Sequence, residues 1–136
     1  MKINGATQIG DTEIKLNDLF GKILWKNNSP SSNFVNSVIT LNSDDYDEYE
    51  IIYSSTNSDT MVKSTGRIPK GYSTTLSMSF GTGSAGPYIR FRHCTYEGIT
   101  KLHFTEGVVA YNSTRPVDNT VCIPLYVIGY KTNIFN

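Results

Sequence analysis

The chain has 136 residues, a length that suits one domain able to bury about two-thirds of its unfolded surface. Twelve Lys and Arg balance twelve Asp and Glu, so the formal net charge is zero. This balance argues against an electrostatic nucleic-acid binder, which carries a basic excess, and against a surface that binds anionic lipid.

The first part of the chain differs in pattern from the rest. Residues 1–21 are predicted to be an N-terminal adaptor or attachment segment, and residues 22–136 the main domain. Met1–Gly5 lacks the apolar region of a signal peptide, so export by the secretory route is not expected. No apolar stretch approaches the length that spans a bilayer, so membrane insertion is not expected either.

Two local structures fit the attachment segment. The runs Ala6–Ile9 and Thr12–Leu16 flank Gly10-Asp11, a pair that suits the two-residue turn of a β-hairpin. A short helix over Asp11–Phe20, ended by Gly21, fits the same residues. The sequence leaves both alternatives open.

The main domain shows short extended runs separated by turn residues, and no convincing long helix. Strands are expected at Lys22–Lys26, Val35–Leu41, Tyr46–Ser54, Met61–Thr65, Tyr72–Phe80, Tyr88–Thr95, Ile99–Thr105, Val108–Asn112 and Thr120–Lys131. Eight or nine strands at this spacing predict an all-β, single-domain antiparallel β-sandwich with jelly-roll-like connections.

The last of these strands is apolar on both faces. Along Thr120–Lys131 one face carries Val121, Ile123, Leu125 and Val127, and the other carries Cys122, Tyr126, Ile128 and Tyr130. A strand with one wet face alternates apolar with polar residues, which this one does not. We therefore expect a core on one face and a second covering layer on the other.

Four stretches resemble a recurrent C-terminal domain of phage and prophage structural proteins. They are Ile23–Pro30 with Phe34, the acidic, Tyr-rich run Asp44–Tyr53, the Arg-rich run Tyr88–Arg92, and Leu125–Lys131. The likeness covers Lys22–Lys131 and rests on a degenerate pattern. Proteins of this group form tail fibres, baseplate appendages or head fibres, and their β-rich tips trimerise.

The resemblance implies a virion protein made in the cytoplasm of the bacterial host. It implies a homotrimer whose neighbouring subunit covers the last strand, with Cys122, Tyr126, Ile128 and Tyr130 as interface residues. Attachment to other virion proteins through the N-terminal segment and binding of a host-surface glycan complete this expectation. Neither nucleic acid nor an inserted membrane is expected as a partner.

Arginines and aromatic residues supply the candidate ligand contacts. Arg90 and Arg92 share a strand face with Tyr88 and could clamp a carboxylate or phosphate of a cell-wall polymer. Ion pairs between these arginines and the acidic Asp44–Glu50 strand, either across the sheet or between subunits, are favoured over that clamp. Trp25 could stack on a sugar, but a place in the core is favoured.

Metal sites and cofactors are not expected. The carboxylates Asp44, Asp45, Asp47 and Glu48 lack the spacing of a calcium loop and are interpreted as a solvated charge cluster. His93 shares a face with Ile89 and Phe91 and is predicted to be a hydrogen-bonded interior residue, whereas His103 is predicted on a wet face. Two histidines alone do not make a zinc site.

Catalysis has no support in the sequence, and the chain is not expected to be an enzyme. No Gly-x-Ser-x-Gly motif is present, and neither cysteine lies in a reactive motif. A disulfide between Cys94 and Cys122 is conceivable, but two reduced, buried thiols are favoured.

We consider three functions. The first, which the resemblance implies, is a virion surface module that contributes to host attachment by binding cell-surface polysaccharide. The second is a carbohydrate-binding module of a larger secreted enzyme, which predicts a monomer with an exposed aromatic platform. The third is a structural decoration protein without a ligand.

Overall fold

The computed structural model describes residues 6–9, 12–15, 20–81, 86–111 and 114–132. Its strands are β1 (Ala6–Ile9), β2 (Thr12–Lys15), β3 (Lys22–Lys26), β4 (Ser37–Thr40), β5 (Glu48–Thr56), β6 (Val62–Pro69), β7 (Thr74–Phe80), β8 (Tyr88–Gly98), β9 (Lys101–Phe104), β10 (Val108–Ala110) and β11 (Val121–Tyr130).

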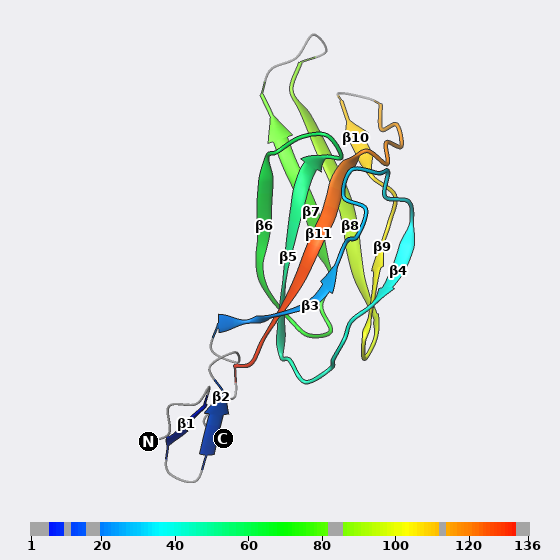
Figure 1. Ribbon diagram of the computed structural model, residues 1–136. Coiled ribbons are helices and arrows are strands. Elements are labelled where there is room, and N and C mark those ends of the chain that lie inside the picture. Colours follow the sequence, from blue (N-terminus) through cyan, green and yellow to red (C-terminus); the bar gives the residue numbers. More distant parts are fainter. Residues whose placement is uncertain (1–5, 10–11, 16–19, 82–85, 112–113, 133–136) are drawn as a thin grey trace.

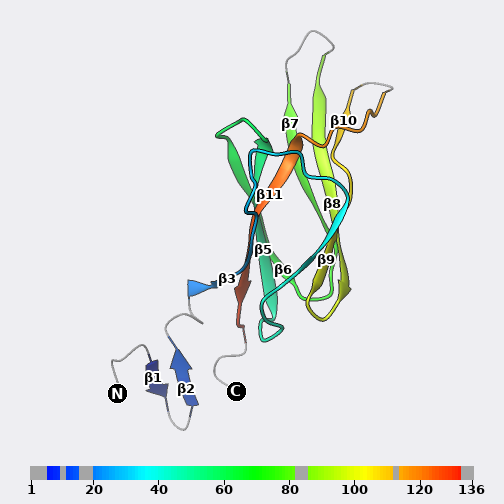
Figure 2. The same ribbon diagram turned by 45° about the vertical axis from the view of Figure 1, so that its right-hand side comes forward.

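Nine of these strands form two antiparallel sheets, which confirms the predicted all-β sandwich (Figures 1 and 2). The four-stranded sheet has the order β3-β11-β5-β6. In the five-stranded sheet, β8 pairs with β7 along its first half, with β10 near its start and with β9 near its end, and β4 lies beyond β9. The chain passes from one sheet to the other between β3 and β4 and returns with β5.

Residues 1–21, the predicted attachment segment, contain two paired strands where the alternative helix would begin. β1 pairs with β2 in an antiparallel register in which Ile9 lies opposite Thr12. The predicted turn residues Gly10-Asp11 lie outside the described residues.

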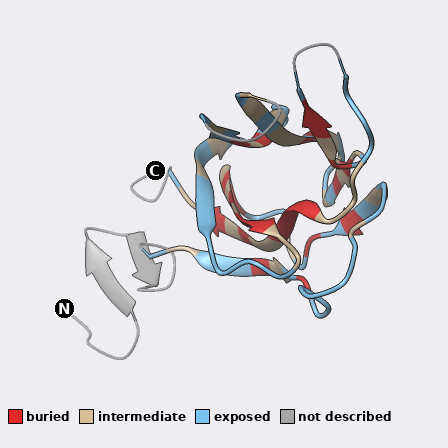
Figure 3. Cartoon of the chain, turned by 90° about the horizontal axis from the view of Figure 1, so that it is seen from above, coloured by how far each residue is buried: buried red, intermediate tan, exposed pale blue. Residues whose placement is uncertain are grey.

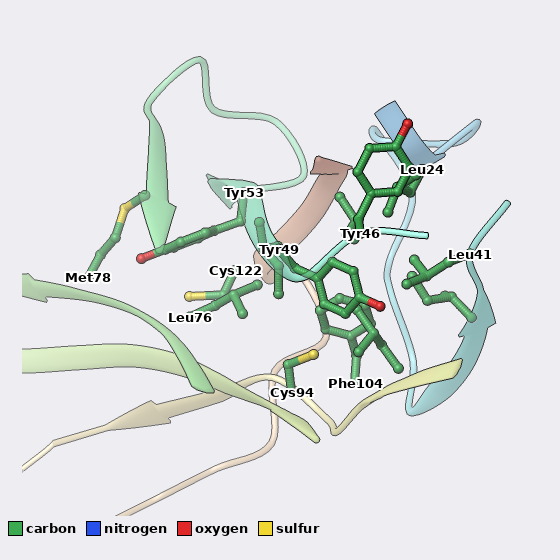
Figure 4. Close-up of a cluster of buried hydrophobic side chains, with 14 residues drawn as sticks. Leu24, Leu41, Tyr46, Tyr49, Tyr53, Leu76, Met78, Cys94, Phe104 and Cys122 are labelled. Carbon is green, nitrogen blue, oxygen red and sulfur yellow. The ribbon is translucent and has the colours of Figure 1, made fainter. Parts of the chain in front are cut away.

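The core lies between the two sheets (Figure 3). Tyr49, Ile51 and Tyr53 of β5 project into it from one sheet, and Leu76 and Met78 of β7 from the other. Figure 4 shows the side chains of Tyr49, Tyr53, Leu76 and Met78 meeting between the sheets. Tyr53 reaches across the sandwich, where its hydroxyl accepts a bond from the Ser77 N–H (3.1 Å) and donates to the Ser77 carbonyl (2.8 Å).

Both cysteines are part of this core. Cys94 and Cys122 are buried free thiols, as the favoured interpretation predicts. Burial raises the pKa of Cys94 to about 12 and that of Cys122 to about 11, so both stay protonated at neutral pH.

β11 lies between β3 and β5, and its first residues, Val121–Pro124, are all buried. Two irregularities break the simple alternation expected for it. Cys122 has a φ of 48°, and the register with β5 shifts between Pro124 and Tyr126. Cys122 consequently lies in the chain's own core with no exposed surface, away from the outer face on which an interface would form.

The outer face of β11 begins after this irregular stretch. Val127 is fully buried and pairs with Ile51 of the core, so its neighbours Tyr126 and Ile128 point outward. Tyr126, Ile128 and Tyr130 are each half-buried.

The inner face of β8 is the one that carries its arginines. Arg92 pairs across the sheet with Leu76, and Arg90 with Met78, both of which are buried. His93 points the other way and is exposed, with its Nδ1 2.9 Å from the Thr75 hydroxyl. The prediction of an interior His93 is therefore wrong, because the apolar residues beside it lie on the outer face.

Candidate functional site

The two ends of the sandwich differ in which chain segments they hold. Gly21 packs on Tyr130, and the Thr132 N–H donates to Asp47 Oδ2 at 3.1 Å, so the chain enters and leaves at one end, the base end. The other end, the tip end, is where β7 finishes and β8 starts (Figure 1).

An aromatic row lies at the tip end. Phe80 and Tyr88 face each other across the β7–β8 register and stack with ring centroids 4.9 Å apart and planes 12° apart. Tyr111 follows β10, whose Ala110 lies opposite Ile89, and its ring is 5.5 Å from that of Tyr88. We call Phe80, Tyr88 and Tyr111 the tip row.

The tip row borders an open hollow of about 410 Å³, the tip hollow. Its lining residues are Ser79, Phe80, Gly81, Pro87, Tyr88, Ile89, Ala110, Tyr111 and Arg115. Tyr111 is 36% exposed, whereas Phe80 and Tyr88 are half-buried. Apolar rings beside a few polar groups in a concave surface are typical of a small-molecule or sugar site.

Arg90 lies against the tip row from within the sandwich. Its guanidinium carbon is 4.5 Å from the centroid of Phe80 and 5.5 Å from that of Tyr88. Its Nη1 donates to the Ser55 hydroxyl at 2.6 Å. A cation over aromatic rings is stabilised by their quadrupoles, so Arg90 is held in place below the row.

Arg92 has a structural role. It has no exposed surface, and its guanidinium donates to the carbonyls of Cys122 (3.0 Å), Val121 (3.0 Å) and Thr105 (2.6 Å). Burial lowers the pKa of Arg92 to about 10, which leaves it charged at neutral pH. It joins the two sheets and offers nothing to an external ligand.

Among the described residues, ion pairs join Arg67 to Glu48 and His103 to Glu97, and neither Arg90 nor Arg92 takes part in one. The prediction of ion pairs across the sheet is therefore wrong within the described part of the chain, and pairs between subunits stay a prediction. The partners of the buried Arg92 guanidinium are carbonyl oxygens, which a sequence pattern does not reveal.

Trp25 packs at the edge of the core. Its ring centroid is 6.2 Å from that of Phe34 and 6.2 Å from that of Phe104. The register between β3 and β11 shifts beside it, so Leu24 is fully buried while Ile23 is 50% exposed. Trp25 lies apart from the residues of the tip hollow.

Two further hollows lie on the surface. The edge hollow, of about 360 Å³, lies between β6 and β7 and is lined by Met61, Val62, Lys63, Met78, Ser79 and Phe80. The third, of about 430 Å³, is lined by Lys26, Asn27, Asn28, Pro30, Leu125 and Tyr126. The edge hollow shares Ser79 and Phe80 with the tip hollow.

No metal centre emerges from the described residues, in which no three His, Cys, Asp or Glu side chains form a group able to hold an ion. His103 contacts the Asn36 side chain through Nε2 and Glu97 through Nδ1 (3.1 Å). Asp47 accepts bonds from Thr132, and Glu48 pairs with Arg67.

Tyr88 is among the residues predicted from the sequence, whereas Phe80, Tyr111 and Arg115 are not. A usable signal was present for Phe80. It and Tyr88 flank the Gly-rich loop at 81–87, and aromatic residues on both sides of a hairpin loop become cross-strand neighbours. Tyr111 and Arg115 carry no such signal, because β10 pairs with the start of β8 rather than with its chain neighbour β9.

Among the described residues, no helix has the length and apolar character that a bilayer crossing requires. Comparison of the chain with protein-family models, with curated proteins and with solved structures finds no match. The site is therefore interpreted from its own geometry.

Proposed function

We propose that the chain is a phage or prophage virion surface module whose tip end binds polysaccharide on the host cell. The observation that carries the binding function is the tip row beside an open hollow. Aromatic rings present flat apolar surface to the C–H faces of sugars, while the Tyr88 and Tyr111 hydroxyls can bond to sugar hydroxyls.

The positions of the base end and the tip end support the proposal that the chain is part of a virion appendage. The attachment segment joins the sandwich at the base end, so a chain anchored through residues 1–21 presents the tip hollow away from the virion. The assignment to a virion itself rests on the resemblance of Lys22–Lys131 to phage structural proteins.

A homotrimer, with a jelly-roll-like domain in each subunit, belongs to this proposal. The outer face of the four-stranded sheet carries half-buried Tyr126 and Ile128 beside Ile23, which is 50% exposed. Tyr130 already has partners within the chain. Its hydroxyl donates to Glu50 Oε1 at 2.6 Å, and the Arg67 guanidinium carbon lies 3.8 Å from the centroid of its ring. Three copies of a weak site would bind a repeating polymer with high avidity.

The binding function is tested with a glycan array, followed by calorimetry on the best ligand. Tyr111→Ala removes the exposed ring of the tip row and is expected to weaken binding by roughly tenfold or more. Tyr72→Ala is the matched control, because Tyr72 is 69% exposed and lies in the β6–β7 connection at the base end.

The oligomer is tested by size-exclusion chromatography with light scattering. A monomer that binds sugar would favour a carbohydrate-binding module of a secreted enzyme. A trimer that binds no sugar on the array would favour a structural decoration protein. Equal loss of binding in the two tyrosine variants would remove the tip row from the proposal.

A further inference from the structure

The tip hollow and the edge hollow share two lining residues. Both are lined by Ser79 and Phe80 at the end of β7, and their volumes are about 410 and 360 Å³. Each volume alone is near the lower limit for a ligand pocket. Because they share these two residues, the two hollows adjoin at the end of β7, with Tyr111 lining one and Val62 of β6 lining the other; we call the pair of hollows the track.

The charges along this track have one sign. Arg115 lines the tip hollow, Lys63 lines the edge hollow, and Arg90 contacts the Phe80 ring between them. No acidic side chain is among the described residues that line either hollow. Asp59 is near in sequence, but its carboxylate accepts the Met61 backbone N–H at 2.8 Å.

This local excess contrasts with the zero net charge of the whole chain. Arginine and lysine at separate points of an apolar groove attract an anionic ligand and bind its carboxylate or phosphate groups through charge-assisted hydrogen bonds. Aromatic rings between those points suit the uncharged faces of the sugars.

We propose that the ligand is a linear acidic polysaccharide that lies along both hollows and crosses Phe80. Arg115 and Lys63 bind successive anionic groups, and Tyr88 and Tyr111 contact the sugar rings. This inference rests on the proposed polysaccharide binding and specifies the charge and the length of the ligand.

The charge is tested by calorimetry of the full chain with three polysaccharides: polygalacturonate, which carries carboxylates; a sugar-phosphate polymer such as phosphomannan, which carries phosphates; and neutral dextran. Binding to at least one acidic polymer, with an affinity that falls as salt rises, is expected. Arg115→Gln should weaken that binding roughly fivefold or more, and Lys101→Gln, which removes an exposed charge from the far end of the five-stranded sheet, should leave it unchanged.

The length is tested with acidic oligosaccharides of increasing size. Lys63→Gln should weaken the binding of long oligosaccharides and leave that of the shortest ones unchanged, because short ligands occupy the tip hollow alone.

The outcomes distinguish failure of the acidic ligand from failure of polysaccharide binding itself. Dextran bound as tightly as the acidic polymers would overturn the acidic ligand and leave polysaccharide binding intact, whereas a blank with every polymer and on the glycan array would overturn both. Acidic binding that is equally weakened by Lys101→Gln would show attraction to the surface at large, and the track would then be discarded.

Discussion

Replacing Arg92 with methionine tests whether the buried guanidinium holds the two sheets together. The substitution keeps an unbranched apolar stem of similar length. It removes the bonds to the carbonyls of Val121 and Cys122 on β11 and of Thr105 after β9. Those three oxygens would then be left in the interior without their donors.

The size of the effect follows from the three bonds. A hydrogen bond to a charged group contributes about 1.5–3 kcal/mol, and a buried acceptor without a partner costs about 1–3 kcal/mol. Removing the guanidinium also removes the cost of its burial, which offsets part of the loss. We expect Arg92→Met to lower the free energy of unfolding by about 3–5 kcal/mol, a large share of the 5–15 kcal/mol typical of a domain.

The assay is urea unfolding followed by tryptophan fluorescence, since Trp25 packs against the core. Arg90→Met is the matched control on the same strand face, because Arg90 makes one side-chain bond, to Ser55, and is only half-buried. It should cost about 1 kcal/mol. Equal costs for the two variants, or a cost below about 1 kcal/mol for Arg92→Met, would refute the assigned role of Arg92.

Three further outcomes are expected. Tyr53→Phe should lower the free energy of unfolding by about 1–3 kcal/mol, because the Tyr53 hydroxyl bonds to β7. Tyr49→Phe should lower it less or raise it, since the Tyr49 hydroxyl has no partner among the described residues. Chemical denaturation compares the two variants. Cys94 and Cys122 should react with a thiol reagent at pH 8 only after unfolding, because burial raises both pKa values, and fast labelling of the folded chain would contradict their burial. Hydrogen bonds from the Ser64 and Tyr130 hydroxyls lower the pKa of Glu50 in the folded chain. The stability that Glu50 contributes is therefore present above its unfolded pKa and is lost as pH falls through its folded pKa. Glu50→Gln should reduce this loss of stability at acid pH in thermal melts, and an unchanged pH profile would refute the linkage.

The strands with regular alternation were predictable from the sequence. Alternation along the strand expected at Tyr46–Ser54 predicts that Tyr49, Ile51 and Tyr53 share a face, and their burial on β5 confirms it. The same pattern places Leu76 and Met78 of β7 in the core. Period-two alternation identifies a face whenever one side is apolar and the other is polar. Strand order is a different matter, because pairings such as β10 with β8 depend on contacts that local patterns do not encode.

Bulges explain the errors on β3 and β11. Alternation along the strand expected at Lys22–Lys26 predicts Ile23 and Trp25 on one face, but the register shift beside them puts Leu24 into the core and leaves Ile23 half exposed. On β11 the register with β5 shifts in the same way between Pro124 and Tyr126. One extra residue reverses every face beyond it, so a rule based on alternation fails at such a point.

The inner face of β8 shows why the candidate site was only partly predictable. Its side chains point the same way at Arg92, Arg90 and Tyr88, and what differs is the extent of the opposite sheet. Arg92 lies opposite the start of β11, where two carbonyls bind it, and Arg90 reaches Ser55 near the end of β5. Tyr88 is two residues further along, about 6–7 Å, and so lies where the opposite sheet ends and a hollow begins. Alternation identifies the face but carries no information about how far the opposite sheet extends, and that distance separates the buried arginine from the residues that are open to a ligand.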